Sequence, residues 1–475
     1  MGNRSDIDKA IRNIMNWADR HEWADELATV LDAHLARVCD HFGISREELS
    51  HELAEHGYGD ILFGVMFEDF LSRRLPPDDR NIIDDYLKHR SWRESVPGRR
   101  YLQKLRDSVL SFYEVVAVSP GHHCDIRDLV RGGETIRVHE HMGTQNLFKW
   151  DRIAARVLYT NGKHVFSGGI LPYSRDAAQS LLRVLEDFRK KLTKELPRLA
   201  GKEVADMMSS SKDLDKLFLQ DAGPTFTSIW LMHTLERLHA PLPELVNRDG
   251  DALVFTETRF PVLAGKFEDI AGRLDTAPGP GWERDDPDGF TWTWLTTPAG
   301  RGKKAITGLA IMSFQDGQRP INGTLELKSD VLIFSTNSME RAERGRQMLE
   351  AHLHGLIGPA LSKIQTPEQL MAEHNTRQQS DDIRKPAESI DPAIAAEIIN
   401  RTLDQHYRQC LDMPIPALDN KTPRQCARSK KGREKVIEWM KHLENNELRR
   451  AANEGHKPYD SRWMWEELKL TRHRD

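Results

Sequence analysis

The stretch FYEVVAVSPG, Phe112–Gly121, marks the point at which the chain changes from helical to strand patterning. It is rich in β-branched and aromatic residues and ends in a Pro-Gly pair, which is typical of a strand followed by a turn. RGGETIRVHEH and DRIAARVLYTNGKHVF continue the strand pattern, the latter with an Asn161-Gly162 hairpin turn. Residues 109–200 are therefore predicted to form a small antiparallel β unit that a long amphipathic helix closes.

The residues before this unit, 1–108, are predicted to be helical. Apolar residues recur there at intervals of three and four, as in DELATVLDAHLARVCDHFGI. Ser45 and Glu48 match a capping box, and Gly43 supplies a turn, so the segment is similar to a helix-turn-helix. The second helix carries four glutamates, which would face phosphates unfavourably. A helical hairpin is therefore the preferred interpretation.

A second set of strand patterns occupies residues 251–374. The stretches TWTWLT, AITGLAIMSF, GTLELKS and VLIFST alternate in polarity and predict an antiparallel sheet, followed by a helix capped near Asn337. Residues 201–250 are predicted to be a helical connector. Residues 375–390 have almost nothing to bury, which predicts a flexible linker.

The whole chain is thus predicted to be an α+β protein. It should have a helical N-terminal region, two antiparallel β-containing middle units and a helical C-terminal module over residues 391–475. The length of 475 residues fits several domains. A net charge of −5 argues against a chain that wraps a polyanion along its whole length.

The apolar runs of the sequence indicate where the protein is located, and the spacing of its cysteines indicates whether they form disulfides. The chain has no signal-peptide-like start and no charge-free apolar run that could span a bilayer. Its four cysteines are far apart and form no CxxC pair, which argues against a disulfide framework. We expect a cytoplasmic protein without membrane attachment.

No motif for a phosphate-binding loop, a dinucleotide fold or a serine nucleophile occurs in the chain. No catalytic residue and no cofactor are therefore predicted, although an enzyme whose site cannot be read from sequence stays an alternative. His139 and His141 alternate along a predicted strand and are the candidates for metal ligation. Because a fixed third ligand is missing, we predict no metal site.

The first β unit offers an alternative function, nucleic-acid binding. Basic and aromatic side chains on a small barrel can contact phosphates and stack on bases. Arginines that alternate with apolar residues are also typical of any half-exposed strand. The candidate nucleic-acid residues are Arg127, Arg131, Arg137, Lys149, Trp150, Arg152 and Arg156.

The most explicit local pattern is MPIPALDNKTPRQCARSKKGREKVIEWMKHLE, Met413–Glu444. Thr422 and Gln425 match a capping box, with Pro423 in the first helical turn. After Gly432, apolar residues fall on one helical face and charged residues on the other. This pattern predicts a compact helical module.

The stretch resembles the C-terminal toxin-binding domain of Xre/ParS-type antitoxins. The usual Trp and one usual Gly of that pattern are Cys410 and Asn420 here. The matching positions are Leu411, Pro414 or Pro416, Leu418, Pro423, Gly432 and Val436. Longer parts of the chain, SFYEVVAVSPG, WDRIAARVL, FSTNSMERAE and YDSRWMWEEL, resemble a family of uncharacterised bacterial proteins that share this end.

The resemblance implies that the C-terminal module binds a protein partner, such as a toxin. We therefore expect a non-enzymatic, antitoxin-like adaptor, while docking of the module on its own chain is the alternative. Aromatic residues and arginine commonly anchor interfaces, and basic residues suit an acidic partner. The candidate partner-binding residues are Arg428, Lys430, Lys431, Arg433, Trp439, Tyr459, Trp463 and Trp465.

Overall fold

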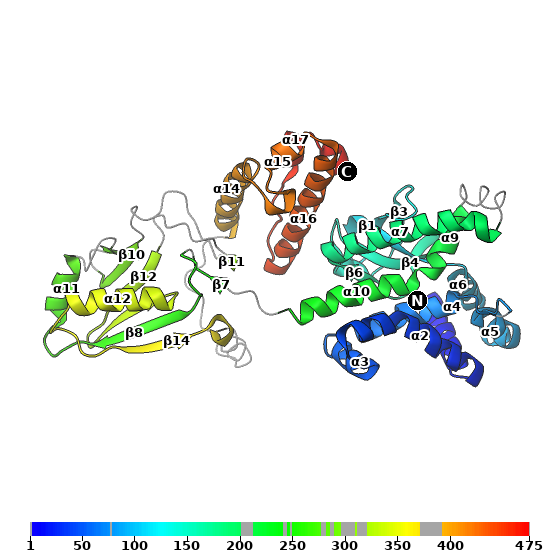
Figure 1. Ribbon diagram of the computed structural model, residues 1–475, viewed down its shortest axis with the longest axis horizontal. Coiled ribbons are helices and arrows are strands. Elements are labelled where there is room, and N and C mark those ends of the chain that lie inside the picture. The colour runs from blue at the N-terminus through cyan, green and yellow to red at the C-terminus, as the bar shows by residue number, and fades with distance from the viewer. Residues whose placement is uncertain are drawn as a thin grey trace. The chain divides into compact units, whose positions relative to one another are not determined.

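The computed structural model shows an α+β protein with helices at both ends and two six-stranded sheets between them (Figure 1). The described residues form two compact units: unit 1 comprises Met1–His239 and Ser389–Asp475, and unit 2 comprises Ala240–Glu388. The predicted linker, 375–390, lies outside the described residues. The structure describes residues 2–76, 78–200, 212–240, 245–247, 249–276, 282–285, 289–295, 309–310, 321–370 and 392–474.

Unit 1 begins with the predicted helical region. Its elements are α1 (Gly2–Ala18), α2 (His21–Phe42), α3 (Arg46–Glu55), α4 (Gly59–Ser72), α5 (Ile82–Arg90), η1 (Ser91–Arg93) and α6 (Val96–Arg106). Gly43 ends α2 in the left-handed conformation, with φ 65°. The capping box of Ser45 and Glu48 is confirmed at the start of α3. Local turn and cap chemistry therefore fixes the α2–α3 corner.

The first sheet is a closed barrel. Its strands are β1 (Leu110–Ser119), β2 (His123–Asp128), β3 (Ile136–His139), β4 (Arg152–Thr160), β5 (Lys163–Phe166) and β6 (Leu171–Tyr173), with η2 (Gly143–Gln145) before β4. The order is β1-β2-β3-β5-β4-β6, and β4 also pairs with β1, which closes β1 to β5 into a barrel. Only the β3–β5 pairing among these strands is parallel. A five-stranded barrel with this order is of the OB type.

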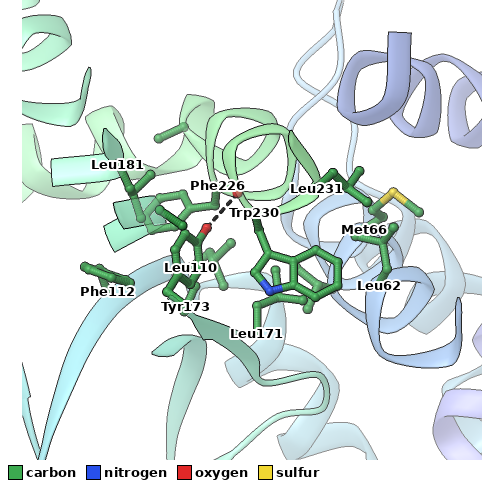
Figure 2. Packing of buried hydrophobic residues seen from close by; sticks show 14 of the residues in the cluster. Leu62, Met66, Leu110, Phe112, Leu171, Tyr173, Leu181, Phe226, Trp230 and Leu231 are labelled. Atoms are coloured by element: carbon green, nitrogen blue, oxygen red, sulfur yellow. Dashed lines mark hydrogen bonds between the residues drawn. The ribbon is translucent and has the colours of Figure 1, made fainter. Parts of the chain in front are cut away.

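Helices cover one side of the barrel. They are α4 together with α7 (Arg175–Ala200), α9 (Lys212–Asp221) and α10 (Gly223–Leu238). Figure 2 shows Phe112 and Tyr173 of the barrel packed among Leu181, Phe226 and Trp230. The Tyr173 hydroxyl donates a hydrogen bond to the Phe226 carbonyl, 2.6 Å away. The predicted connector, residues 201–250, thus contains α9 and α10, and both helices pack on the first β unit.

Unit 2 is a separate sheet with helices. Its elements are β7 (Leu245–Val246), β8 (Phe255–Pro261), α11 (Phe267–Asp275), β9 (Trp282–Arg284), β10 (Thr291–Leu295), β11 (Leu309–Ala310), β12 (Ile321–Leu327), β13 (Val331–Thr336), α12 (Met339–His352) and β14 (Leu361–Gln365). The six-stranded order is β14-β8-β13-β12-β10-β9, and every pairing in it is antiparallel. Ser338, and not Asn337, caps α12, because its hydroxyl accepts the Arg341 N–H. The predicted strand AITGLAIMSF lies mostly outside the described residues.

The C-terminal module, defined here as residues 392–474, completes unit 1. It contains α14 (Pro392–Cys410), η3 (Pro416–Leu418), α15 (Pro423–Cys426), α16 (Lys430–Glu454), α17 (Arg462–Glu467) and η4 (Thr471–His473). The capping box of Thr422 and Gln425 is confirmed. A Cβ atom at Gly432 would lie 2.0 Å from the Cys426 carbonyl oxygen. The close approach of α15 to α16 therefore requires glycine at this position of the antitoxin-like pattern.

None of the helices in the described ranges is both long and apolar enough to cross a bilayer.

Candidate functional site

A hollow of about 930 Å³ runs along the barrel beside β3 and the β4–β5 hairpin. Its lining includes basic side chains, one tyrosine and the four carboxylates of Asp107, Asp128, Glu134 and Asp215. We call this hollow the barrel groove and define it by Arg131, Arg137, His139, Tyr159, Lys163 and His164. A second hollow, of about 880 Å³, extends it past the β1–β2 loop and shares His139 and Lys163 with it.

Tyr159 is the exposed aromatic residue of the barrel groove. Its exposed fraction is 56%, and its ring centroid lies 5.0 Å from that of His164. Tyr159 pairs with His164, and Thr160 with Lys163, across the β4–β5 hairpin. The tight turn between them uses Asn161 and Gly162, with φ 50° and 79°, which confirms the predicted hairpin turn. The hairpin thus presents Tyr159 and His164 on one face, and the side chain of Lys163 leaves the opposite face at the tip of the hairpin.

Ion pairs hold the arginines of the barrel groove. Arg131 binds Asp128, with its Nε 2.8 Å from the carboxylate, and also donates to the Tyr113 hydroxyl. Arg137 makes two bonds to Asp125, at 2.8 and 2.9 Å. The hydrogen bonds from Arg137 lower the pKa of Asp125. Lys163 forms no ion pair with any carboxylate in the described part of the chain. Lys216, an exposed residue of α9 that also lines the hollow, forms none there either, so these two lysines carry the charges most available to an anionic ligand.

The groove includes only Arg131 and Arg137 of the seven predicted nucleic-acid residues. Arg127 is half-buried on β2 and does not line the groove. Lys149, Trp150 and Arg152 contact the C-terminal module, and Arg156 is buried. Sequence reasoning did not single out Tyr159, Lys163 and His164, which line the groove. The signal that could have identified them is an aromatic residue two positions before, and two basic residues immediately after, the Asn161-Gly162 turn.

Arg156 belongs to a buried polar cluster around Asp69. Asp69 binds Arg156 at 3.0 Å, Arg73 at 2.7 Å and His34 at 3.2 Å. Burial opposes ionisation of Asp69, but the hydrogen bond from His34 and the charges of Arg73 and Arg156 outweigh it and lower the pKa to about 2. The carboxylate is therefore ionised and fully paired. We name this set, with Thr227, the Asp69 cluster.

Thr227, His34 and Asp69 are connected in the order of a nucleophile, a base and an acid, but they are buried and a substrate cannot reach them. Thr227 Oγ1 lies 2.7 Å from His34 Nδ1, and the other nitrogen of His34 faces Asp69. Both Thr227 and His34 have an exposed fraction of 0%. A nucleophile needs contact with its substrate, so we assign this cluster to stability. It joins α2, α4, α10 and β4.

The C-terminal module docks on the barrel through one face of α16. Glu438, Lys441 and Arg449 lie at three- and eight-residue steps along that face. They pair respectively with Arg152, Glu114 and Asp151, and the Lys441–Glu114 distance is 2.7 Å. Each of these three charges thus has an opposite partner on the barrel.

Trp150 is the aromatic centre of this contact. Its backbone has φ 74°, which is uncommon for a bulky residue. Its indole N–H donates to Glu444 at 2.9 Å, and its ring stacks on Trp465 at a centroid distance of 6.3 Å. Lys441 Nζ lies 4.5 Å from the same ring. The strained backbone orients Trp150 toward the module.

The predicted partner-binding residues separate into two groups. The aromatic ones are mostly internal: Trp465 is fully buried, Trp439 packs half-buried on the module core, and Trp463 donates to the Tyr459 hydroxyl. Tyr459 in turn donates to Asp404. The basic ones are exposed, and we call them the basic rim: Arg428, Lys430, Lys431 and Arg433. None of the four forms an ion pair with a described carboxylate.

The two candidate metal ligands, His139 and His141, have different neighbours. The ring of His139 is 6.2 Å from that of His123 on the neighbouring strand. His141 Nδ1 lies 2.6 Å from the Gly121 carbonyl oxygen. Within the described ranges, no three His, Cys, Asp or Glu side chains form a group that could hold a metal ion.

Comparison with family models gives a match to part of the chain. Residues 67–199 match the model of a family of unknown function, DUF7986. The matched segment runs from α4 through the barrel into α7, so it includes Asp69, Arg156 and the barrel groove but not the C-terminal module. No curated protein matches the chain.

Proposed function

We propose that the barrel groove binds single-stranded nucleic acid. One observation carries the proposal: the exposed Tyr159, its cross-strand partner His164 and the basic residue Lys163 all line one groove of an OB-type barrel. Proteins that bind single strands combine aromatic side chains, on which bases stack, with basic side chains that contact phosphates. OB-type barrels bind oligonucleotides across strands 2 and 3 and the loops β1–β2 and β4–β5.

The positions of the two hollows on the barrel also support single-stranded nucleic acid as the ligand. The barrel groove includes β3 and the β4–β5 turn, and the adjoining hollow includes Gly121 and His122 of the β1–β2 loop. A strand of several nucleotides can therefore follow the two hollows past their shared residues, His139 and Lys163. The fold suggests the ligand class, while Tyr159 and Lys163 define the site. Because Arg131 and Arg137 are already paired, we expect moderate, sequence-tolerant binding.

The first prediction concerns Tyr159→Ala. We expect it to weaken binding of a fluorescent single-stranded oligonucleotide by about 5- to 150-fold, because stacking on an aromatic ring contributes about 1–3 kcal/mol per base. Fluorescence anisotropy at low salt measures the affinity of the full chain. Lys163→Gln should reduce the dependence of affinity on salt by about 0.7 in the logarithmic slope.

Trp92→Ala is the matched control, because Trp92 is 71% exposed and lies outside the barrel groove. It should bind the oligonucleotide as the unaltered protein does. No binding by the unaltered protein at low salt, or equal binding by Tyr159→Ala, would contradict the proposal.

A second candidate function is the antitoxin-like binding of an acidic protein partner by the basic rim. Four cations without ion pairs among the described residues gather at the start of α16, on the module that resembles a toxin-binding domain. Because the module's aromatic residues pack internally, the contact would be mainly electrostatic. This adaptor would be non-enzymatic. We also propose a cytoplasmic location, which the four free cysteines support.

The second prediction is that replacing all four rim residues by glutamine abolishes this binding. Co-purification from host extract at low salt should retain an acidic protein on the unaltered chain and lose it on the variant, because steering charges are removed. High salt should release the same protein. Retention of the same proteins by both chains would refute the assignment of the basic rim.

A further inference from the structure

A cavity of about 420 Å³ lies within unit 1, where α16 meets the helices and the barrel. One wall comes from Tyr58, Trp230, Arg237 and the segment from Pro172 to Arg175. The opposite wall comes from α16, with His442 and Asn446 among its residues. A molecule in this cavity would therefore contact both the C-terminal module and the rest of unit 1. Its volume is in the range of small-molecule sites.

The cavity carries an excess of positive charge, because its carboxylates are all paired and, among the described residues, two arginines are not. Glu114, Asp151 and Glu438 line it, and each pairs with a basic residue of the same wall or the facing one. Two arginines remain, Arg175 and Arg237. Neither forms an ion pair with a carboxylate in the described part of the chain.

These two arginines lie on one side of the cavity and have few hydrogen-bond partners among the described residues. Arg237 donates to the Tyr58 hydroxyl at 3.3 Å, and no hydrogen bond to Arg175 is present among the described residues. Facing them on α16, His442 has a lowered pKa, because of burial and then the charge of Arg175; Asp176 acts in the opposite direction. Planar guanidinium groups bind phosphate oxygens in pairs of hydrogen bonds.

The remaining part of this wall is aromatic. The rings of Tyr58 and Trp230 meet edge to face, 5.4 Å apart, and Tyr173 lies beside them. The Trp230 N–H donates to the Pro172 carbonyl at 2.8 Å, which fixes the indole. A ligand that fits this wall has an anionic group at the arginines and a flat apolar group at the rings.

We propose that this cavity binds a small organic phosphomonoester, whose phosphoryl group contacts Arg175 and Arg237, and that the bound ligand strengthens docking of the C-terminal module. The inference is independent of nucleic-acid binding, since no residue of the barrel groove lines the cavity. Anything that binds the docked state and not the undocked state stabilises docking by mass action.

Calorimetric titration of the full chain with adenosine monophosphate, inorganic phosphate and adenosine tests the proposal. We expect the monophosphate to bind at least about tenfold more tightly than either fragment, because only it engages both the arginines and the aromatic rings. Hydrogen exchange of α16 should slow when the monophosphate is bound. Equal binding of phosphate and monophosphate, or no change in α16, would overturn the proposal.

Variants distinguish this site from the barrel groove. Arg175→Gln combined with Arg237→Gln should reduce monophosphate affinity about tenfold or more, since charge-assisted bonds are lost. Arg183→Gln, at an exposed position on α7 outside the cavity, is the matched control. Tyr159→Ala should bind the monophosphate normally. Unaltered affinity of the double variant, or loss of affinity in Tyr159→Ala, would contradict the site; an unchanged melting temperature without ligand establishes that each variant is folded.

Discussion

Asp69→Asn is expected to lower the free energy of unfolding of unit 1 by about 3–5 kcal/mol, because it leaves buried positive charges without a partner. Arg156 and Asp69 are both about 2% exposed in their side chains, and Arg73 bonds the same carboxylate. Asparagine keeps the shape of aspartate but carries no charge, so the loss measures the ion pairs and not the packing. Few single substitutions in this unit should cost more.

Hydrogen exchange followed by mass spectrometry separates the two units of the chain. In Asp69→Asn, peptides from α2, α4 and α10 should exchange faster, whereas peptides from β12 and β13 of unit 2 should not change. Asp60→Asn, at an exposed position of the same helix, is the control and should change unfolding by less than about 1 kcal/mol. Unaltered protection in Asp69→Asn would show that the cluster does not stabilise unit 1.

Glu444→Gln is expected to remove about 2–4 kcal/mol from the stability of the C-terminal module, because one buried carboxylate accepts four hydrogen bonds. Arg474 donates at 2.7 Å, Ser461 at 2.8 Å, Trp150 at 2.9 Å and Trp465 at 3.2 Å. Glutamine offers one acceptor oxygen and places an NH₂ group against these donors. Trp150 belongs to the barrel, so the substitution should also weaken docking.

Hydrogen-exchange rates of α16 and α17 measure the loss of module stability and docking in Glu444→Gln. Both helices should exchange faster in Glu444→Gln, and the near-ultraviolet circular dichroism from the stacked indoles of Trp150 and Trp465 should decrease. Glu434→Gln, at an exposed position of the same helix, should leave both signals unchanged. If Glu444→Gln leaves exchange and dichroism as they were, Glu444 does not hold the module on the barrel.

Much of the fold could be predicted because its signals are local. The capping boxes at Ser45 and Thr422, the left-handed Gly43 and the Asn161-Gly162 turn each depend on residues within a few positions. Periodicity identified most helices and strands for the same reason. The closure of β4 onto β1 and the parallel β3–β5 contact are long-range pairings, and no local pattern encodes them.

The site was harder to predict, since exposure depends on distant partners. Arg156 and Arg137 look alike as arginines in alternating strands, but Arg156 meets Asp69 in the core, 87 positions away. Trp150 meets Glu444, 294 positions away, which gives its aromatic ring an internal role. Tyr159 continues the face of Ile153 and Ala155, yet it is exposed because the strand extends past the core. Alternation identifies a face but not where the core ends.

The central claim, that the barrel groove binds single strands, is tested most directly by photo-crosslinking. A single-stranded oligonucleotide containing a photoreactive base would be irradiated with the full chain, and the crosslinked peptides would be identified by mass spectrometry. Stacking on Tyr159 predicts crosslinks in residues 131–139 and 159–164, which disappear with Tyr159→Ala and persist with Trp92→Ala. Crosslinks confined to the C-terminal module or to unit 2, or none at all at low salt, would contradict the claim.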